Sequence, residues 1–411
     1  MVLEMRKMKD SGIEWIGEIP EGWEVVQLKR FAEVHNGREI DVEVDSTDSS
    51  AVGVYGSGGV FKYTNRAQYS GKAVLFGRKG TLGKPLYVEG QLWAVDTMYF
   101  LTYSNRLLEK FSYYQFLAFN WAPYITHTAI PSVVASEIVA CYFPIPPLEE
   151  QAKIADYLDN GCASLDTILD KTRSSIEEYK KLKQAVITQA VTKGVRGERE
   201  MKDSGVEWIR AIPKEWVCEK IKYATSISRG LFNHRPRNDE RYYNGKYPFI
   251  QTGDVANATK YIVSYSQTLN ELGKSVSKEF PKGTLTMTIA ANVGDVAILN
   301  FDAYFPDSVV GFIPNKNIRT LYLFYVFSAM KDEFTRTAIK STQLNLNIDR
   351  VKETFIPVTL DSNEQCEIEN YLESKCAEID GLIAKKEHLV KELESYKKSL
   401  IYEVVTGKRE V

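Results

Sequence analysis

The sequence predicts an α+β protein that contains an internal duplication. We expect two variable modules, each a curved or twisted β-sheet with helices, separated by two long antiparallel coiled-coil helices with pseudo-two-fold symmetry. Three observations predict this architecture: a duplicated segment rich in tryptophan, a duplicated long helical pattern, and short β-like runs punctuated by glycine between them.

The first repeat pairs residues 8–30 with residues 201–223. Without a gap, 12 of the 23 positions are identical, and Trp23 aligns with Trp216. A match of this length within one chain indicates duplication, so the chain consists of two halves of about 200 residues each.

Two further repeats follow in the same order. Residues 150–169 align with residues 364–383 at an offset of 214, and Asp96 aligns with Asp307 at an offset of 211, compared with 193 for the first repeat. Length differences therefore concentrate in the middle of each half. We interpret these middles as two modules with different targets on a duplicated frame, and ordinary drift of surface loops after duplication is the alternative.

The repeats predict four segments. In chain order these are an N-terminal segment shared by both halves plus the first module (1–147), a long central helix (148–197), the repeated segment plus the second module (198–360), and a C-terminal long helix (361–411). The variable modules themselves are expected over about residues 24–144 and 217–358.

The two long helical patterns predict a coiled coil. Apolar residues recur at heptad spacing in both copies, and Lys183 and Lys397 interrupt the copies at equivalent places. The expected seam residues are Leu158, Cys162, Leu165, Leu169 and Ile176 in the first copy and Leu372, Cys376, Ile379, Ile383 and Val390 in the second. Because the two cysteines occupy the same seam position, we expect both to be packing residues. Two halves joined through one self-complementary seam favour antiparallel pairing.

The module sequences predict mixed strands and helices. Strands are expected at residues 73–76, 86–88 and 98–102 in the first module and at residues 284–289 and 296–299 in the second. Packed helices are expected at the aromatic-rich residues 111–120 and 321–327.

Composition excludes several classes of protein. The 411 residues are 44% apolar and 26% charged, as in globular domains, and no apolar run reaches the length of a membrane span. The N-terminal residues hold no apolar core of a signal peptide, so a cytoplasmic protein is expected. Five scattered cysteines and four isolated histidines predict neither a disulfide framework nor a metal site.

Local charge departs from the net charge of −2. Residues 49–88 contain no acid and six basic residues, and residues 220–238 contain no acid and five basic residues. Blocks of this kind suit contact with DNA phosphates and bases, and a solvated surface with a chance shortage of acids is the alternative. The expected DNA-contacting residues are Ser57, Lys62, Arg66, Arg78, Lys79 and Lys84 in the first module and Arg229, His234, Arg235, Arg237, Asn292 and Gln343 in the second.

Catalytic motifs are missing from the sequence. Residues 77–84 resemble a phosphate-binding P-loop, but the spacing is one residue too long and Pro85 replaces the hydroxyl residue that would hold Mg²⁺. Pro306-Asp307 is not followed by the acid-x-Lys of a nuclease, and Asp307 matches Asp96, so a structural role is expected for it. We therefore expect no catalytic residue, no metal and no cofactor in this chain.

Several motifs together resemble the specificity subunit of a Type I restriction-modification enzyme. They are Ser11-Gly-Ile-Glu-Trp-Ile-Gly-Glu-Ile-Pro-Glu-Gly-Trp23 with its copy at 204–216, Tyr55-Gly-Ser-Gly-Gly59, Phe249-Ile-Gln-Thr-Gly-Asp254, and Ile145-Pro-Pro-Leu-Glu-Glu-Gln151. The resemblance covers essentially the whole chain. It departs at residues 356–365, where Ile-Pro-Val-Thr-Leu-Asp-Ser-Asn-Glu-Gln replaces the second Pro-Pro-Leu helix entry.

The resemblance implies two target recognition domains, each reading one half of a bipartite site in double-stranded DNA, with the paired helices setting the distance between half-sites. It implies no catalysis in this chain. Two modification subunits would flip and N6-methylate an adenine in each half-site with S-adenosylmethionine. Restriction subunits, which use ATP and Mg²⁺, would add a translocating nuclease.

Two other functions share part of these features. A specificity module of a different DNA methylation or phage-defence complex would have the same fold and other partners. A non-DNA coiled-coil scaffold would show no salt-dependent binding to duplex DNA.

Overall fold

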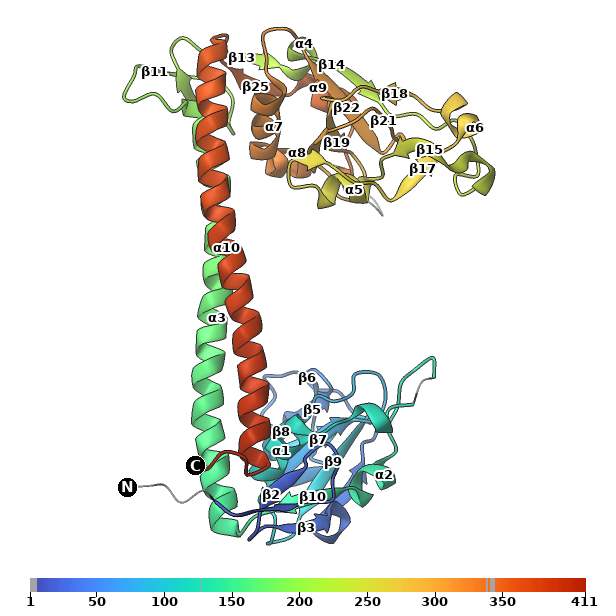
Figure 1. Cartoon of the computed structure of the whole chain (residues 1–411), viewed down its shortest axis with the longest axis vertical. Coiled ribbons are helices and arrows are strands. Elements are labelled where there is room, and N and C mark those ends of the chain that lie inside the picture. Colours follow the sequence, from blue (N-terminus) through green and yellow to red (C-terminus); the bar gives the residue numbers. More distant parts are fainter. Residues whose placement is uncertain (1–5, 127, 338, 341–343) are drawn as a thin grey trace. The chain divides into compact units, whose positions relative to one another are not determined.

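The computed structural model describes residues 6–126, 128–337, 339–340 and 344–411. It contains two compact units (Figure 1). Unit 1 combines the chain up to Ser174 with Lys386–Val411, and unit 2 is Ser175–Lys385. Each unit therefore holds one module, the first part of the long helix that follows it, and the last part of the other long helix.

The repeated N-terminal segments form the same hairpin in both units. The strands are β1 (Met8–Asp10) and β2 (Glu18–Pro20) in unit 1 and β11 (Met201–Asp203) and β12 (Ala211–Pro213) in unit 2. Met8 pairs with Pro20 as Met201 pairs with Pro213. The residue before the second strand has a left-handed backbone in both hairpins, although it is Gly17 (φ 72°) in the first and Arg210 (φ 64°) in the second. The duplicated sequence thus folds into a duplicated structure.

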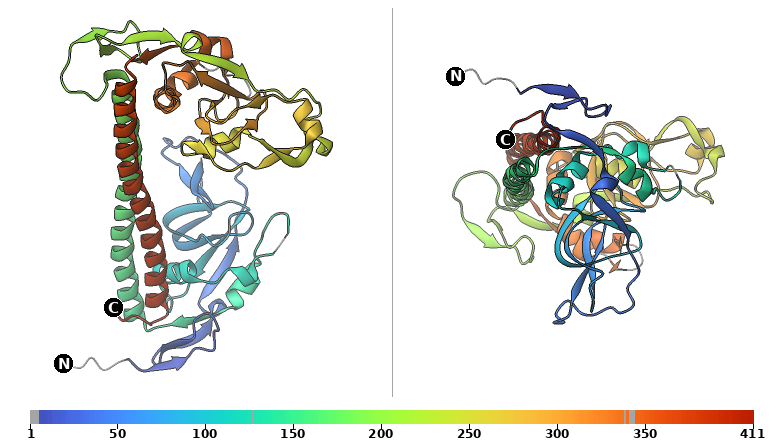
Figure 2. Two further views of the ribbon diagram at one scale, coloured as in Figure 1. Left: turned by 45° about the horizontal axis from the view of Figure 1, so that its top comes forward. Right: turned by 90° about the horizontal axis from the view of Figure 1, so that it is seen from below.

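The long helices are α3 (Leu148–Lys193) and α10 (Ser362–Val405). In unit 1 the first part of α3 packs against the last part of α10, and in unit 2 the last part of α3 packs against the first part of α10 (Figure 2). The helices are therefore antiparallel, as the sequence predicts. A glycine with left-handed backbone follows each helix, Gly194 (φ 73°) and Gly407 (φ 71°), which is a common way to end a helix.

Ion pairs across the helix pair are reciprocal between the units. Lys397 of α10 lies 2.6 Å from Asp166 of α3 in unit 1, and Lys183 of α3 lies 2.7 Å from Asp380 of α10 in unit 2. Both members of each pair are related by the repeat offset of 214. Such exchange of partners is what pseudo-two-fold symmetry requires. The two lysines that interrupt the apolar seam therefore pair the helices through charge.

The expected seam residues differ in burial. Those that are buried are Leu158, Cys162, Leu165, Leu169 and Ile176 on α3 and Leu372, Cys376 and Ile379 on α10. Ile383 and Val390 are only half-buried. Leu158 and Leu372 also belong to the core of a module, so more than the partner helix covers them.

Unit 1 is built around a six-stranded sheet with the order β4-β9-β7-β8-β5-β6. Its strands are β4 (Ala32–Asn36), β5 (Val52–Gly56), β6 (Gly59–Thr64), β7 (Tyr69–Gly77), β8 (Leu86–Ala94) and β9 (Met98–Tyr103). The sheet is strongly curved. The end of β8 lies beside the start of β7, whereas Met98 at the start of β9 lies beside Gly77 at the end of β7. Leu92 is the register partner of Tyr69, so the six residue steps from Leu92 to Met98 must connect the two ends of β7. They reach at most about 22 Å, less than the roughly 27 Å between Tyr69 and Gly77 in a straight strand.

The remaining elements of unit 1 connect the sheet to α3. They are β3 (Glu24–Gln27), β10 (Tyr142–Ile145), α1 (Glu109–Ala118) and α2 (Ala135–Ala140). The strands β3 and β10 pair with each other, and α1 packs on β7 and β8. The predicted strands and the aromatic-rich helix of the first module are thus all present.

Unit 2 contains two larger sheets, with the strand orders β14-β22-β19-β20-β16 and β17-β15-β21-β18. The strands of these sheets and the shorter pairs are β13 (Val217–Lys220), β14 (Thr225–Arg229), β15 (Tyr243–Phe249), β16 (Tyr261–Ile262), β17 (Gln267–Leu269), β18 (Glu279–Phe280), β19 (Leu285–Thr288), β20 (Val296–Leu299), β21 (Ala303–Tyr304), β22 (Val309–Pro314), β23 (Ile339–Lys340), β24 (Leu344–Asn345) and β25 (Phe355–Val358). The short helices are α4 (Ile221–Ala224), α5 (Thr252–Asn257), α6 (Glu271–Ser275), α7 (Thr320–Ala329), α8 (Lys331–Thr337) and α9 (Ile348–Glu353).

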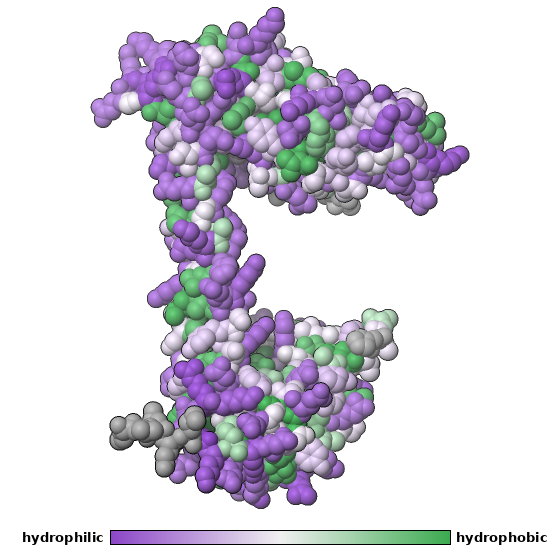
Figure 3. All heavy atoms as spheres, in the orientation of Figure 1, coloured by the Kyte–Doolittle hydropathy of each residue, from purple (hydrophilic) through white to green (hydrophobic). Residues whose placement is uncertain are grey.

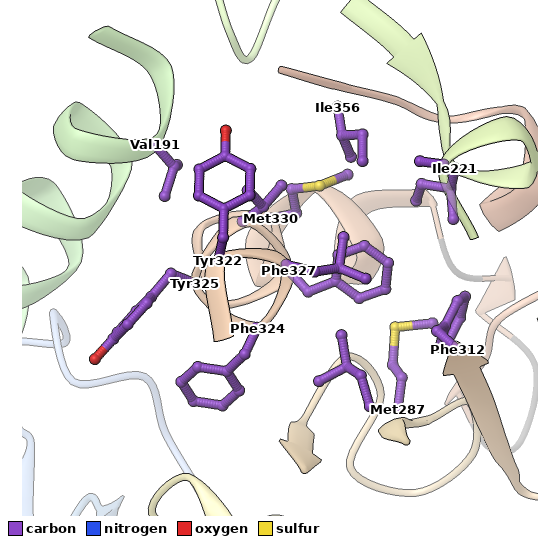
Figure 4. Close-up of a cluster of buried hydrophobic side chains, with 14 of the residues drawn as sticks. Val191, Ile221, Met287, Phe312, Tyr322, Phe324, Tyr325, Phe327, Met330 and Ile356 are labelled. Carbon is purple, nitrogen blue, oxygen red and sulfur yellow. The ribbon is translucent and has the colours of Figure 1, made fainter. Parts of the chain in front are cut away.

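Helix α7 is the centre of the unit 2 core. Side chains on several sides of it, such as Tyr322, Phe324 and Phe327, are buried, which explains why its sequence is aromatic and apolar all round (Figure 4). Phe312 of β22 meets Phe327 edge-on, with ring centroids 5.0 Å apart. Val191 of α3 packs in the same cluster, so the module and the helix share one core.

A buried glutamine in the first turn of each long helix ties the module to that helix. Gln151 accepts a hydrogen bond from the Leu108 amide (2.8 Å) and donates to the carbonyls of Arg106 and Pro146. Gln365 makes the same three bonds in unit 2, to the amide of Arg319 and the carbonyls of Asn317 and Thr359. Both glutamines are fully buried, so each one satisfies three backbone groups that have little access to water.

A tryptophan and a glutamate complete this contact. Trp23 donates its indole N–H to Glu150 (3.0 Å), and Trp216 donates to Glu364 (2.9 Å). An arginine lies 2.6 Å from each carboxylate, Arg6 in unit 1 and Arg199 in unit 2. The clusters differ in exposure, because the Glu150 side chain is 25% exposed and that of Glu364 only 1%.

No helix among the described residues is long and apolar enough to cross a membrane. Hydrophilic residues cover most of the face of each unit that Figure 3 shows, with smaller apolar patches between them.

Candidate nucleic-acid interface

Equivalent loops meet at one edge of both modules. In unit 1 the Arg78 amide donates to the carbonyl of Thr97 (2.7 Å), and in unit 2 the Ile289 amide donates to the carbonyl of Ser308 (3.0 Å). A third loop adds to each turn, since the Val133 amide donates to Arg78 and the Leu346 amide donates to Ile289. All of these residues correspond at offsets of 211 to 213, so the frame of this edge is the same in both modules.

A glycine brings a fourth segment against the same edge. Gly37 donates to Met98 and Gly230 to Val309, both at 2.9 Å. A Cβ atom at Gly37 would lie 1.8 Å from the Val95 carbonyl oxygen, and a Cβ atom at Gly230 would lie 2.2 Å from that of Pro306. Only glycine permits this approach. We call this edge the tip surface, which comprises residues 37–38, 78–84, 95–97 and 128–133 in unit 1 and residues 229–237, 289–295, 305–308 and 346 in unit 2.

Three predicted or neighbouring basic residues of unit 1 are already paired with acids. Lys62 lies 2.8 Å from Glu43, Arg66 pairs with Asp41, and Lys72 lies 3.8 Å from Glu89. The block 49–88 lacks acids in sequence, but acids just outside it neutralise half of its charge in the fold. Lys62 and Arg66 remain predicted DNA contacts, although these ion pairs lower the local positive potential.

The other predicted basic residues of unit 1 lie on the tip surface. Arg78, Lys79 and Lys84 belong to the turn between β7 and β8, and none has an ion-pair partner among the described residues. Arg78 lies over the Tyr99 ring (5.7 Å), which leaves its N–H groups available. Ser57 lies nearby, because the Val95 amide donates to the Tyr55 carbonyl beside the β5–β6 turn.

Arg38 is a candidate that sequence reasoning missed. It is exposed, follows Gly37 directly, and has no ion pair within the described part of the chain. The sequence does point to Arg38, because Gly37 aligns with Gly230 at the offset of 193. This alignment places Arg38 at the same edge of its module as Arg229 in the second module.

Three predicted arginines of unit 2 gather around one acid. Arg229 donates its Nε to the Asp307 backbone carbonyl (2.5 Å), Arg237 pairs with the Asp307 carboxylate, and Arg235 lies 3.8 Å from it. Asp307 lies in the link that supports the Ile289 turn. The structure thus brings these arginines together on the tip surface.

His234 is part of the support of this arginine loop. Its ring stacks on Tyr242 with centroids 4.0 Å apart, and its Nε2 lies 3.0 Å from Asp239. Hydrogen bonds from Arg241, and secondarily from His234, hold the pKa of Asp239 well below its usual range. His234 is half-buried, and its Nε2 is occupied by the contact with Asp239 inside the loop.

Of the two predicted amide residues, Asn292 and Gln343, the structure describes only the first. Asn292 is exposed at the turn between β19 and β20, next to Ala291, which has a left-handed backbone (φ 64°). Gln343 lies outside the described residues.

Two further lysines of the second basic block, Lys220 and Lys222, share Glu353 and lower the pKa of its carboxyl to about 2.

No cluster of three or more His, Cys, Asp or Glu side chains that would hold a metal occurs in the described parts of the chain. What the two tip surfaces offer is basic side chains, amides and backbone on exposed turns, held by rigid sheets. Side chains of these kinds suit phosphates and base edges, and the chain is a protein with two such modules, each joined to a pair of long helices.

Comparison with known proteins assigns the family. The family model for the Type I restriction modification DNA specificity domain matches residues 20–178 and 227–392. The chain therefore belongs to this family, with one copy of the domain in each half, and it is a DNA sequence-specificity subunit.

Two curated relatives and one solved structure are similar to this chain. The MjaVIII specificity subunit of a type I restriction enzyme from Methanocaldococcus jannaschii is 24% identical over 451 aligned positions, covering 99% of this chain and 98% of the relative. The MjaIX specificity subunit of the same organism is 28% identical over 177 positions, covering 41% of this chain and 39% of the relative. A solved chain from work on complex assembly and conformational transition of the type I R-M system shares the fold, with a TM-score of 0.73, 16% identity, and coverage of 95% of this chain and 99% of that one.

Proposed function

We propose that each module reads one half of a bipartite site in double-stranded DNA through its tip surface. The observation that carries this proposal is that the same four-segment frame presents different side chains in the two modules. Unit 1 offers Arg38, Arg78 and Lys79, whereas unit 2 offers an arginine cluster and Asn292. A common frame with unlike side chains is expected where two domains bind one class of ligand and read different sequences.

The paired helices set the separation of the half-sites in this proposal. The pseudo-two-fold frame also provides two equivalent docking surfaces, so two copies of one modification subunit are the expected partners. These subunits would supply S-adenosylmethionine-dependent adenine methylation, and restriction subunits would supply the ATP- and Mg²⁺-dependent activity. The chain itself recognises DNA without catalysis and acts in the cytoplasm.

Mapping N6-methyladenine in a host with and without the gene tests this proposal. We expect a split motif of two short half-sites with a constant gap to lose methylation in the deletion strain. The purified complex of the chain with its modification subunits should bind a duplex carrying that motif with affinity that falls steeply as salt rises. A flat salt response, or an unchanged methylation map, would reject it and favour the scaffold alternative.

A further inference from the structure

Asp307 stands out as an acid at the centre of a surface that is otherwise arranged for an anionic partner. Its carboxylate pairs with Arg237 and lies 3.8 Å from Arg235, while its backbone carbonyl accepts from Arg229. A carboxylate near DNA phosphates weakens binding by repulsion, so its position calls for a compensating role.

The fold of the turn does not require this acid to bind arginine. The equivalent residue in unit 1, Asp96, lies in the same link between strands, and the backbone bond from Arg78 to Thr97 matches the bond from Ile289 to Ser308. Among the residues that the structure describes, Asp96 makes no ion pair. The arginine contacts of Asp307 are therefore an addition made in the second module alone.

Two of the three arginines, Arg235 and Arg237, share the Asp307 carboxylate as a counter-charge, which offsets the repulsion between them. Arg235 is also fixed by bonds to the carbonyls of Phe232 (2.7 Å) and His234 (2.8 Å). Arg235 and Arg237 remain 56% and 44% exposed, so both guanidinium groups face solvent while the acid holds them. A guanidinium has five N–H donors, which lets one edge bind a carboxylate and another bind a guanine edge or a phosphate.

We propose that Asp307 is a positioning residue for DNA recognition by the second module. It holds Arg235 and Arg237 in a fixed orientation toward one half-site, which increases the preference of the module for its target sequence. Its negative charge also weakens non-specific attraction to DNA. This inference rests on the proposed function, since it concerns how the same surface reads its target.

The test uses the chain assembled with its modification subunits and three duplexes: the target found by methylation mapping, and two versions with one or the other half-site scrambled. For Asp307→Asn we expect preference for one half-site to fall about tenfold or more. Preference for the other half-site is unchanged, and affinity for the duplex with the scrambled half-site is equal or higher because an acid has been removed.

Glu353→Gln is the matched control, because it removes the same charge from the same unit and also releases two basic residues, away from the tip surface. Its half-site preferences should stay within about threefold of the parent. Arg237→Lys gives a second variant that keeps the charge but loses the planar fork, and it should show the same selective loss as Asp307→Asn.

The outcomes separate the possibilities. A parent complex without salt-dependent preference for the target would reject the proposed function itself. If the parent discriminates, but Asp307→Asn raises affinity for all duplexes equally, the acid acts only through its charge, and the inference is wrong. Equal weakening on all duplexes would mark Asp307 as a residue of the fold, and unchanged preference in Arg237→Lys would also overturn the inference.

Discussion

The two modules present the same turn from the same edge of a sheet, but they hold their positive charge differently. In unit 1, Arg78, Lys79 and Lys84 have no acid partner within the described residues, so no carboxylate offsets their charge. In unit 2, Asp307 gathers the arginines and fixes them. From this comparison we expect unit 1 to contribute more of the general attraction to DNA and unit 2 more of its geometric selectivity. The frame beneath the turns, in contrast, has the same central backbone hydrogen bonds in both modules.

The largest expected effect tests whether the buried glutamine contributes equally to the stability of the two units. Gln151→Leu and Gln365→Leu should each destabilise the chain by about 3 kcal/mol, because three poorly hydrated backbone groups lose their partners. Denaturant unfolding measures this change. Exposed Gln91→Leu should change stability by less than about 0.5 kcal/mol. A large effect at only one of the two buried glutamines would show that the units are not energetically equivalent.

The second prediction tests whether unpaired cations contribute more to DNA binding than cations that are already paired with acids. Replacing Arg78, Lys79 and Lys84 together with alanine should weaken duplex binding about 30-fold and flatten its salt dependence, because unpaired cations on the tip surface are removed. Replacing Lys62, Arg66 and Lys72 removes the same charge from the same block, but these cations are already paired. That variant should lose only about threefold in affinity. Equal losses in a binding titration at several salt concentrations would contradict the assignment of the tip surface.

The third prediction concerns the difference in burial between the two tryptophan–glutamate–arginine clusters. Arg199→Ala should cost about 2 kcal/mol of stability, because Glu364 is almost fully buried and loses its nearer cation, with only Arg196 left at 3.9 Å. Arg6→Ala should cost less than about 1 kcal/mol, since Glu150 keeps access to water. Melting temperatures of the two variants in the same buffer compare these costs, and a larger loss for Arg6→Ala would reverse the expected order.

The smallest effect is a pH dependence. The pKa of Glu353 is lowered to about 2 by Lys220 and Lys222, so its ion pairs stabilise the folded state above the ordinary pKa of a glutamate. This contribution is lost as the pH falls toward the folded pKa. Glu353→Gln should therefore be slightly less stable than the parent at neutral pH, and the difference should shrink between about pH 4.5 and pH 2. A difference in melting temperature that stays constant over this range would contradict the ion pairs.

Much of the fold could be predicted because it is encoded in local patterns. The heptads determined both long helices, and the aligned Trp23 and Trp216 revealed the duplication. The ion-pair role of Lys183 and Lys397 could not be predicted, because it depends on which acid the antiparallel partner brings opposite each lysine. In the same way, the acid-free block of the first module did not reveal that Asp41, Glu43 and Glu89 would fold back onto it.

The duplicated segments and heptads were enough to predict that one unit of structure is used twice, that long paired helices join the copies, and that the chain resembles a DNA specificity subunit. These conclusions need only residue identity and spacing along the chain. The tertiary structure decided which cations are free, that Gly37 and Gly230 admit a fourth segment to the tip surface, and that Asp307 serves three arginines. The reason is physical: charge pairing and close approach are set by strand register and sheet curvature, which bring together residues that lie far apart in sequence.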